Sequence, residues 1–208
     1  MKYGKRTLGQ VEAIFNKLGG DSAVERILSG ELVVSVVEAI KTVADKLLEF
    51  INTVTVPATG NFVAKNHFII NTAQDALVRI GWMGDDFREH FLSKIEDASG
   101  EMELFYYKLR QPSRDIPILS ELGGDETRVE TTLSKLWELL ELQGRGQDGV
   151  LLTNGYANVF YVRDPDGILW TVDVGWLAGA GVWDVHAASL SHPRDWDAGS
   201  QVFSRNSR

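Results

Sequence analysis

The stretch VFYVRDPDGILWTVDVGW, residues 159–176, decides the fold class of this chain. Two runs rich in β-branched and aromatic residues, 159–163 and 168–176, flank the tetrapeptide Asp164-Pro165-Asp166-Gly167. Such runs are typical of strands, and Pro, Asp and Gly are typical of the turn between them. The stretch therefore predicts an antiparallel hairpin. Alternate residues of its second strand share one face, and these are Ile168, Trp170, Val172, Val174 and Trp176.

The residues after the hairpin extend the predicted sheet. Small residues at 177–181 indicate a turn, and the run 182–187 indicates a third strand. The tail from Ser189 to Arg208 is polar, with Trp196, Val202 and Phe203 as expected anchors in the core. The C-terminal third is therefore expected to form an antiparallel β-sheet.

The first quarter of the chain has the spacing of helices. Residues 10–30 predict a helical hairpin, and residues 31–52 predict one long helix. The β-branched start of the second segment, 32–37, is equally typical of a strand. The apolar seam along residues 31–52 would pack within the monomer or against a second copy, so it is a candidate homo-oligomer interface. The seam consists of Val33, Val36, Ile40, Val43, Leu47 and Phe50.

The middle of the chain contains segments with the apolar spacing of helices and segments with the alternation of strands, which favours an α+β fold. A capping box formed by Thr127 and Glu130 indicates the start of its clearest helix. We expect a helical N-terminal unit at residues 1–56 and an α+β body at residues 61–208, with separate cores or one shared core. The elements expected between them are a linker at 53–60, a strand at 67–70, a helix at 84–98, a strand at 102–109, a loop at 110–120 and a helix at 126–143.

Composition and charge exclude several classes of protein. The 208 residues contain no cysteine, which removes disulfides, thiolate zinc sites and cysteine nucleophiles. The net charge is −8 and no long segment is basic, so binding to nucleic acid or anionic membranes is disfavoured. The most apolar segment, 32–51, carries five charged residues, and no apolar run follows the basic start of the chain. We therefore expect a cytoplasmic protein.

Two stretches match parts of known binding motifs, but the residues around them do not support the binding function. Residues 144–149 match the glycine pattern of dinucleotide-binding loops, but they follow a predicted helix and precede a strand, which is the reverse of the required order. The turn Asp164-Pro165-Asp166-Gly167 lacks the further oxygen ligands of a calcium loop.

Asp184 and His186 form the best candidate for chemistry. Residues two apart in a strand point the same way, so both side chains would address one metal ion or substrate. His192 and Asp195 follow closely and would complete a site for a divalent metal such as Zn, Mn or Fe. This hypothesis implies a metal-assisted hydrolase. The alternative is a polar outer face followed by a solvated loop.

Four of the six tryptophans fall within 27 residues of the C-terminal third. If exposed, their rings would stack on sugars or bases, and if buried, they would form the core of the sheet. The shared face predicted for the second strand favours the core. The four are Trp170, Trp176, Trp183 and Trp196.

Several short stretches together resemble a family of uncharacterised bacterial proteins that has no assigned function. They are 151–155, 160–164 and 201–206, with Leu18-Gly19-Gly20 and Gly84-Asp85-Asp86-Phe87. The resemblance spans most of the chain and implies a bacterial intracellular protein, of cellular or phage origin. It assigns no role to any residue. We expect a non-catalytic binding or interaction protein, with the metal-assisted hydrolase as the alternative.

Overall fold

The computed structural model describes residue 16 and residues 20–29 and 46–205. The chain divides into two compact units, Met1–Thr42 and Val43–Arg208. In the first unit the described residues form helix α2 (Gly20–Leu28), which matches the second half of the predicted helical hairpin. In the first half of that hairpin only Asn16 is described, and it is helical.

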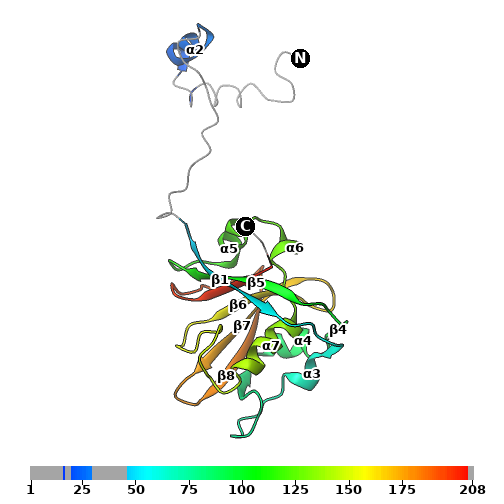
Figure 1. The fold of residues 1–208 in the computed structure, drawn as a ribbon. Coiled ribbons are helices and arrows are strands. Elements are labelled where there is room, and N and C mark those ends of the chain that lie inside the picture. Colours follow the sequence, from blue (N-terminus) through cyan, green and yellow to red (C-terminus); the bar gives the residue numbers. More distant parts are fainter. Residues whose placement is uncertain (1–15, 17–19, 30–45, 206–208) are drawn as a thin grey trace. The chain divides into compact units, whose positions relative to one another are not determined.

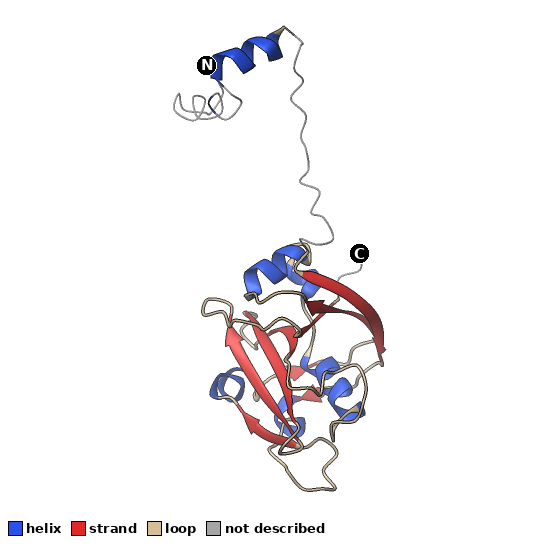
Figure 2. Ribbon diagram, turned by 90° about the vertical axis from the view of Figure 1, so that its left-hand side faces the viewer, coloured by secondary structure: helices blue, strands red, loops and turns tan. Residues whose placement is uncertain are grey.

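The second unit is built on a mixed seven-stranded sheet (Figures 1 and 2). The strand order is β1-β5-β9-β6-β7-β8-β3. The pairs β6–β9 and β3–β8 are parallel and the other four are antiparallel. The strands are β1 (Leu48–Val56), β3 (Ile80–Met83), β5 (Met102–Leu109), β6 (Asn158–Arg163), β7 (Leu169–Leu177), β8 (Val182–Ser189) and β9 (Gln201–Ser204). Two short strands, β2 (Phe62–Val63) and β4 (Ile95–Glu96), pair separately.

The two faces of the sheet carry different side chains. Helices α3 (Ala64–His67), α4 (Asp85–Phe91) and α7 (Leu133–Leu142) cover what we call the apolar face. Helices α5 (Asp115–Glu121) and α6 (Glu126–Val129) cover part of the opposite face, which we call the polar face. The apolar face includes Phe160, Val162, Trp170, Val172, Val174, Trp183 and Val185. The polar face includes Val159, Tyr161, Thr171, Asp173, Asp184 and His186.

The predicted hairpin is confirmed as β6 and β7, with Phe160 opposite Val172. Asp164 holds its turn, since Oδ1 accepts hydrogen bonds from the backbone N–H groups of Asp166 and Ile168 at 3.0 and 2.9 Å. Ile168 itself precedes β7 and is exposed. The strands predicted at 102–109 and 182–187 are confirmed as β5 and β8.

The expectation of a purely antiparallel C-terminal sheet is wrong. Strand β9, from the predicted polar tail, lies in the middle of the sheet between β5 and β6 and runs parallel to β6. Trp196, Val202 and Phe203 are buried, as expected of anchors. Local periodicity cannot show this insertion, because the partners of β9 come from residues 105–108 and 158–159, far away in the sequence.

The helix predicted at 31–52 is wrong over its last part. Residues 48–52 belong to β1, which continues to Val56 through the first half of the predicted linker and pairs with β5. The carboxylate of Glu121 accepts hydrogen bonds from the N–H groups of Leu47 and Leu48 at 2.9 and 3.0 Å, where the strand begins. Residues 30–45 lie outside the described residues, so the proposed oligomer seam stays a prediction there. Leu47 is buried within the second unit, which removes it from such a seam.

The helix predicted at 126–143 is two helices, α6 and α7. Thr131 breaks it by donating its N–H to the Tyr161 carbonyl at 2.7 Å. The caps are Asp125 and Thr132 instead of Thr127. The predicted loop at 110–120 contains α5. The helix predicted at 84–98 is shorter than expected and ends at Phe91. The strand predicted at 67–70 is absent, since the described residues there form no strand.

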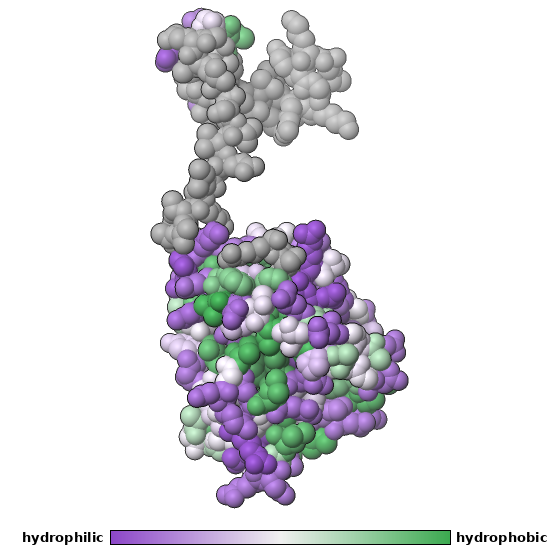
Figure 3. All heavy atoms as spheres, viewed as in Figure 1, coloured by the Kyte–Doolittle hydropathy of each residue, from purple (hydrophilic) through white to green (hydrophobic). Residues whose placement is uncertain are grey.

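Within the part of the chain that the structure describes, none of the helices has the length and apolar character needed to cross a membrane. On the side drawn in Figure 3, apolar residues gather in the middle of the second unit with hydrophilic residues around them.

Candidate functional site

A bulge in edge strand β3 brings an aromatic side chain onto the polar face. Ile80 pairs with Trp183, but Trp82 pairs with Asp184, so Gly81 is the extra residue between them. A Cβ at Gly81 would lie 2.5 Å from Cγ2 of Val182, so only glycine fits there without a shift. Because a bulge changes which side chains share a face, Trp82 lies on the side of Asp184 and His186.

A cavity of about 820 Å³ opens at this edge of the sheet, and we call it the edge pocket. Its lining combines apolar and polar side chains from β3, β8 and the turn that follows β7. The main contributors are Arg79, Trp82, Leu177, Val182, Asp184 and His186. Cavities of this size with a few polar groups on an apolar lining are typical of small-molecule sites.

The indole of Trp82 packs against two neighbours and is still partly exposed. Gly84 lies so close that a Cβ there would meet the ring at 3.2 Å, and the imidazole of His186 lies with its centroid 4.7 Å from the indole. The residue nevertheless remains 43% exposed. The other five tryptophans are at most 8% exposed, so Trp82 is the one tryptophan whose ring is open to a ligand.

Arg194 determines the tautomer of His186. Its guanidinium donates through Nη1 to Oδ1 of Asp173 at 3.0 Å and contacts Nδ1 of His186 through Nη2 at 3.3 Å. Since arginine is only a donor, Nδ1 must accept, and a neutral imidazole then carries its proton on Nε2. His186 therefore presents an Nε2–H donor.

The pKa values of these groups follow from burial and from Arg194. Burial, and then the charge of Arg194, lower the pKa of His186 to about 4, so the ring is neutral at neutral pH. Burial raises the pKa of Asp173 to about 6 although Arg194 opposes the shift. Burial also raises the pKa of Asp184, one of whose oxygens is buried without a hydrogen-bond partner. Because Asp184 also lines the edge pocket, its carboxylate can accept a hydrogen bond from a ligand there.

A third carboxylate lies deeper under the same face. Asp115, at the start of α5, is fully buried, and its Oδ1 accepts from Trp196 Nε1 at 2.8 Å and from the Tyr161 hydroxyl at 3.3 Å. Burial raises its pKa, and the hydrogen bonds oppose that rise. The charge of Asp115 contributes to the raised pKa of Asp173, so the two carboxylates are electrostatically coupled.

The structure brings together only two of the four residues predicted as metal ligands. Asp184 and His186 share the polar face and line the edge pocket. Asp195 is instead paired with Arg114 at 2.6 Å, and His192 is exposed with Nδ1 near the Ser191 hydroxyl. The described residues hold no group of three or more His, Asp or Glu side chains arranged for a metal ion.

The contact with Arg194 also makes His186 a poor metal ligand. Metal-bound histidines usually donate their other N–H to a carboxylate or carbonyl. Here a guanidinium donor faces Nδ1, so metallation at Nε2 would place an N–H against the N–H of Arg194. Of the four residues predicted as metal ligands, only Asp184 is therefore left as a suitable one.

The predicted stacking platform of four tryptophans is wrong. The exposures are 8% for Trp170 and Trp176, 0% for Trp183 and 4% for Trp196. Trp170 and Trp176 belong to the apolar core, as the shared face indicated, and so does Trp183. Trp196 packs in the core under the polar face. None of the four rings is available to a ligand.

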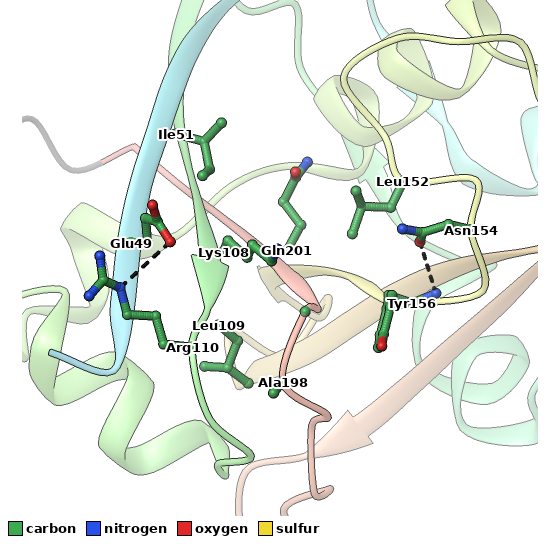
Figure 4. A pocket seen from close by; sticks show the side chains of 11 residues that line it. Glu49, Ile51, Lys108, Leu109, Arg110, Leu152, Asn154, Tyr156, Ala198 and Gln201 are labelled. Carbon is green, nitrogen blue, oxygen red and sulfur yellow. Dashed lines mark hydrogen bonds and ion pairs between the residues drawn. The ribbon is translucent and has the colours of Figure 1, made fainter. Parts of the chain in front are cut away.

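A second cavity, of about 560 Å³, lies at the β1 side of the sheet, and we call it the Tyr156 pocket (Figure 4). Figure 4 shows Glu49 and Arg110 on one side, and Asn154 and Tyr156 on the loop opposite. The register of β1 shifts between Phe50 and Asn52, and Ile51 between them lines the Tyr156 pocket. Both edge strands, β1 and β3, thus have an irregular register beside a cavity.

Trp82, Arg194 and Gly81 are the residues that sequence reasoning missed. Trp82 lies in a four-residue strand whose bulge interrupts the alternation. Arg194 lies in an irregular segment with no period at all. Comparison with protein-family models, curated proteins and solved structures finds no match to this chain.

Proposed function

We propose that the protein binds a small organic molecule in the edge pocket and catalyses no reaction on it. The observation that carries this proposal is the position of Trp82, the one exposed tryptophan, beside an oriented imidazole and an unpaired carboxylate. The other five tryptophans are buried.

The polar groups of the edge pocket select the ligand's chemistry. His186 offers an Nε2–H donor and Asp184 an acceptor, on residues roughly 7 Å apart along the strand. The exposed part of the Trp82 ring favours a flat ring. These features together favour a planar heteroaromatic ring that carries both an acceptor and an N–H donor, as nucleobases and aromatic amides do. The net charge of −8 favours a free base or nucleoside over a polynucleotide.

The same contacts argue against acid–base catalysis. Nδ1 of His186 is occupied by Arg194 and Nε2 carries the proton, so the imidazole has no free site for a substrate proton. Asp173 is nearly buried and is bound by Arg194. A metal-assisted hydrolase at Asp184 and His186 remains the alternative proposal. It is disfavoured because the described residues supply too few metal ligands there.

The fluorescence of Trp82 tests the binding proposal. Iodide reaches only exposed indoles, so the quenchable fraction of the emission should report on Trp82. We expect adenosine, guanosine, cytidine, uridine or nicotinamide to protect this fraction in the full chain. The variant Trp82→Phe should remove it without ligand. Asp184→Asn and His186→Ala should each weaken the protection by about 3- to 10-fold, the effect of one hydrogen bond.

Failure would be equally clear. If none of these probes protects Trp82, and a chemically diverse fragment set shifts no backbone resonance of β3 or β8, the edge pocket is not a binding site. A preference for flat hydrocarbons, unaffected by Asp184→Asn, would keep the pocket and reject the donor–acceptor selection.

The hydrolase alternative is tested by thermal unfolding of chelator-treated protein with Zn, Mn or Ca. A metal that binds the native state raises the midpoint by mass action. If the binding proposal holds, none of these metals should raise the midpoint of the wild type through His186. A rise that occurs in the wild type and is lost in His186→Ala would favour the hydrolase over the binding protein.

Two further proposals rest on the sequence. The cysteine-free composition supports a cytoplasmic location. The seam predicted at 31–52 supports self-association through its part outside the described residues, which sedimentation of the full chain and of a variant with charged residues at Val36 and Ile40 would test.

A further inference from the structure

We propose that the Tyr156 pocket is a second binding site, and that it takes a pyranose sugar. It lies by β1, β5 and β9, at the opposite edge of the sheet from β3 and the edge pocket. No residue lines both cavities. The two sites are therefore structurally independent, and this proposal does not rest on the first.

Tyr156 provides a fixed aromatic surface in this pocket. Its ring packs on Gly199, where a Cβ would meet ring carbons at 3.0 to 3.2 Å. Gly199 also has a φ of +102°, which strongly favours glycine. The residue is still 41% exposed, so part of the ring is left for a ligand. A pyranose places its apolar C–H face against such a ring and its hydroxyl groups around the edge.

Unused hydrogen-bonding groups surround that ring. The ammonium of Lys108, the hydroxyl of Tyr156 and the side-chain N–H₂ of Asn154 line the pocket and make no hydrogen bond to another described residue. Oδ1 of Asn154 accepts from the backbone N–H of Tyr156 at 3.3 Å, which holds the amide in place. Gln201 is anchored by a 2.7 Å bond from Nε2 to the Val150 carbonyl, which leaves its side-chain oxygen as an acceptor. Figure 4 shows Lys108 and Gln201 between the two walls.

The charges in the pocket favour a neutral polyol over an anion. Glu49 lies 3.6 Å from Arg110, so the two charges offset each other and Lys108 adds a single positive charge. An anion bound there would meet the carboxylate of Glu49 as well as the cations. Sugar hydroxyls both donate and accept, so they match a lining that contains cations, a carboxylate and amides. The volume of about 560 Å³ lies in the usual range for small ligands.

Saturation-transfer NMR on the full chain tests this site, with methyl glycosides of glucose, galactose, mannose and N-acetylglucosamine as probes. We expect at least one glycoside to receive saturation. Tyr156→Ala should weaken its binding about tenfold, the usual effect of losing one aromatic contact. Tyr156→Phe should retain most of the affinity, and Lys108→Met should lower it by a smaller factor. Trp82→Ala is the matched control at the other site and should change nothing.

Gly199→Ala gives a second variant that keeps every polar group of the pocket. The added methyl group should displace the Tyr156 ring, so glycoside binding should fall while the unfolding transition stays cooperative. The proposal is overturned if no glycoside binds, if Tyr156→Ala and Gly199→Ala leave binding unchanged, or if inorganic phosphate binds at Lys108 in preference to every glycoside.

Discussion

The apolar and polar faces of the sheet are made by the same strands and differ in what they bury. On β7, Trp170, Val172 and Val174 point into the apolar core, while Thr171 and Asp173 between them point to the polar face. Three helices cover the apolar face. The polar face is covered by α5 and α6 on its β1 side, and it opens into the edge pocket beside β8 and β3.

The difference suggests that the apolar face provides most of the stability and that the polar face carries the groups suited to binding. The apolar face gains its free energy from close-packed rings and aliphatic side chains. The polar face buries Asp115 and Asp173, which cost free energy unless they are hydrogen-bonded or paired. Ionisable groups with shifted pKa values gather on this face, as they do at functional sites.

The largest effect is expected from a cavity on the apolar face. Trp183→Ala should lower the free energy of unfolding by about 3–5 kcal/mol, because the ring is fully buried and its Nε1–H donates to the Gln143 carbonyl at 3.0 Å. Urea denaturation would measure the loss. A loss below about 1 kcal/mol would show that the apolar face does not carry the stability.

The pH dependence of stability should reveal two opposed contributions from the polar face. Asp173 has a pKa of about 6 in the folded protein, above its unfolded value, so its contribution to stability falls as the pH rises from about 4 to 6. Asp115, whose pKa is also raised, acts in the same direction. His186 has a folded pKa of about 4, below its unfolded value, so its contribution falls as the pH drops below about 6.5.

Single variants should separate the two. In Asp173→Asn, stability should rise more steeply with pH between 4 and 7 than in the wild type, by roughly 3 kcal/mol in total. In His186→Gln it should fall over the same range. Urea titrations at each pH provide the measurement. Parallel profiles for both variants and the wild type would contradict the assigned protonation states.

Removing the cation that joins these groups should have an intermediate effect. Arg194→Met leaves Asp173 buried without its partner and should cost about 1–3 kcal/mol at pH 7, and less at pH 5, where the carboxyl is protonated. It should also raise the pKa of His186, measurable by NMR. The double variant Arg194→Met, Asp173→Asn should recover part of the stability. Additive losses would mean that the two side chains do not interact.

The smallest effect on stability is expected at the edge pocket. Trp82→Ala removes a 43% exposed ring and should lower the free energy of unfolding by about 1 kcal/mol, well below the loss expected for Trp183→Ala. It should nevertheless abolish the iodide-quenchable emission. A loss comparable to that of Trp183→Ala would assign Trp82 to the core instead of to a ligand.

The sequence by itself determined the elements that depend on local chemistry. The β6–β7 hairpin, β5 and β8 follow from period-two alternation and turn residues, and the burial of Trp170 and Trp176 follows from the same pattern. The common face of Asp184 and His186 was equally readable from their spacing. Hydrogen-bond periodicity and steric preference act over a few residues, which is why they leave a signature in sequence.

Tertiary structure alone decided the rest. The insertion of β9 between β5 and β6 and the pairing of β1 depend on partners more than 40 residues away. The bulge at Gly81 moved Trp82 to the polar face, and Arg194 set the tautomer of His186 from eight residues along the chain. Residue identity limits what a side chain can donate or accept, but its partner and its burial, and hence its role, are settled only when distant segments pack together.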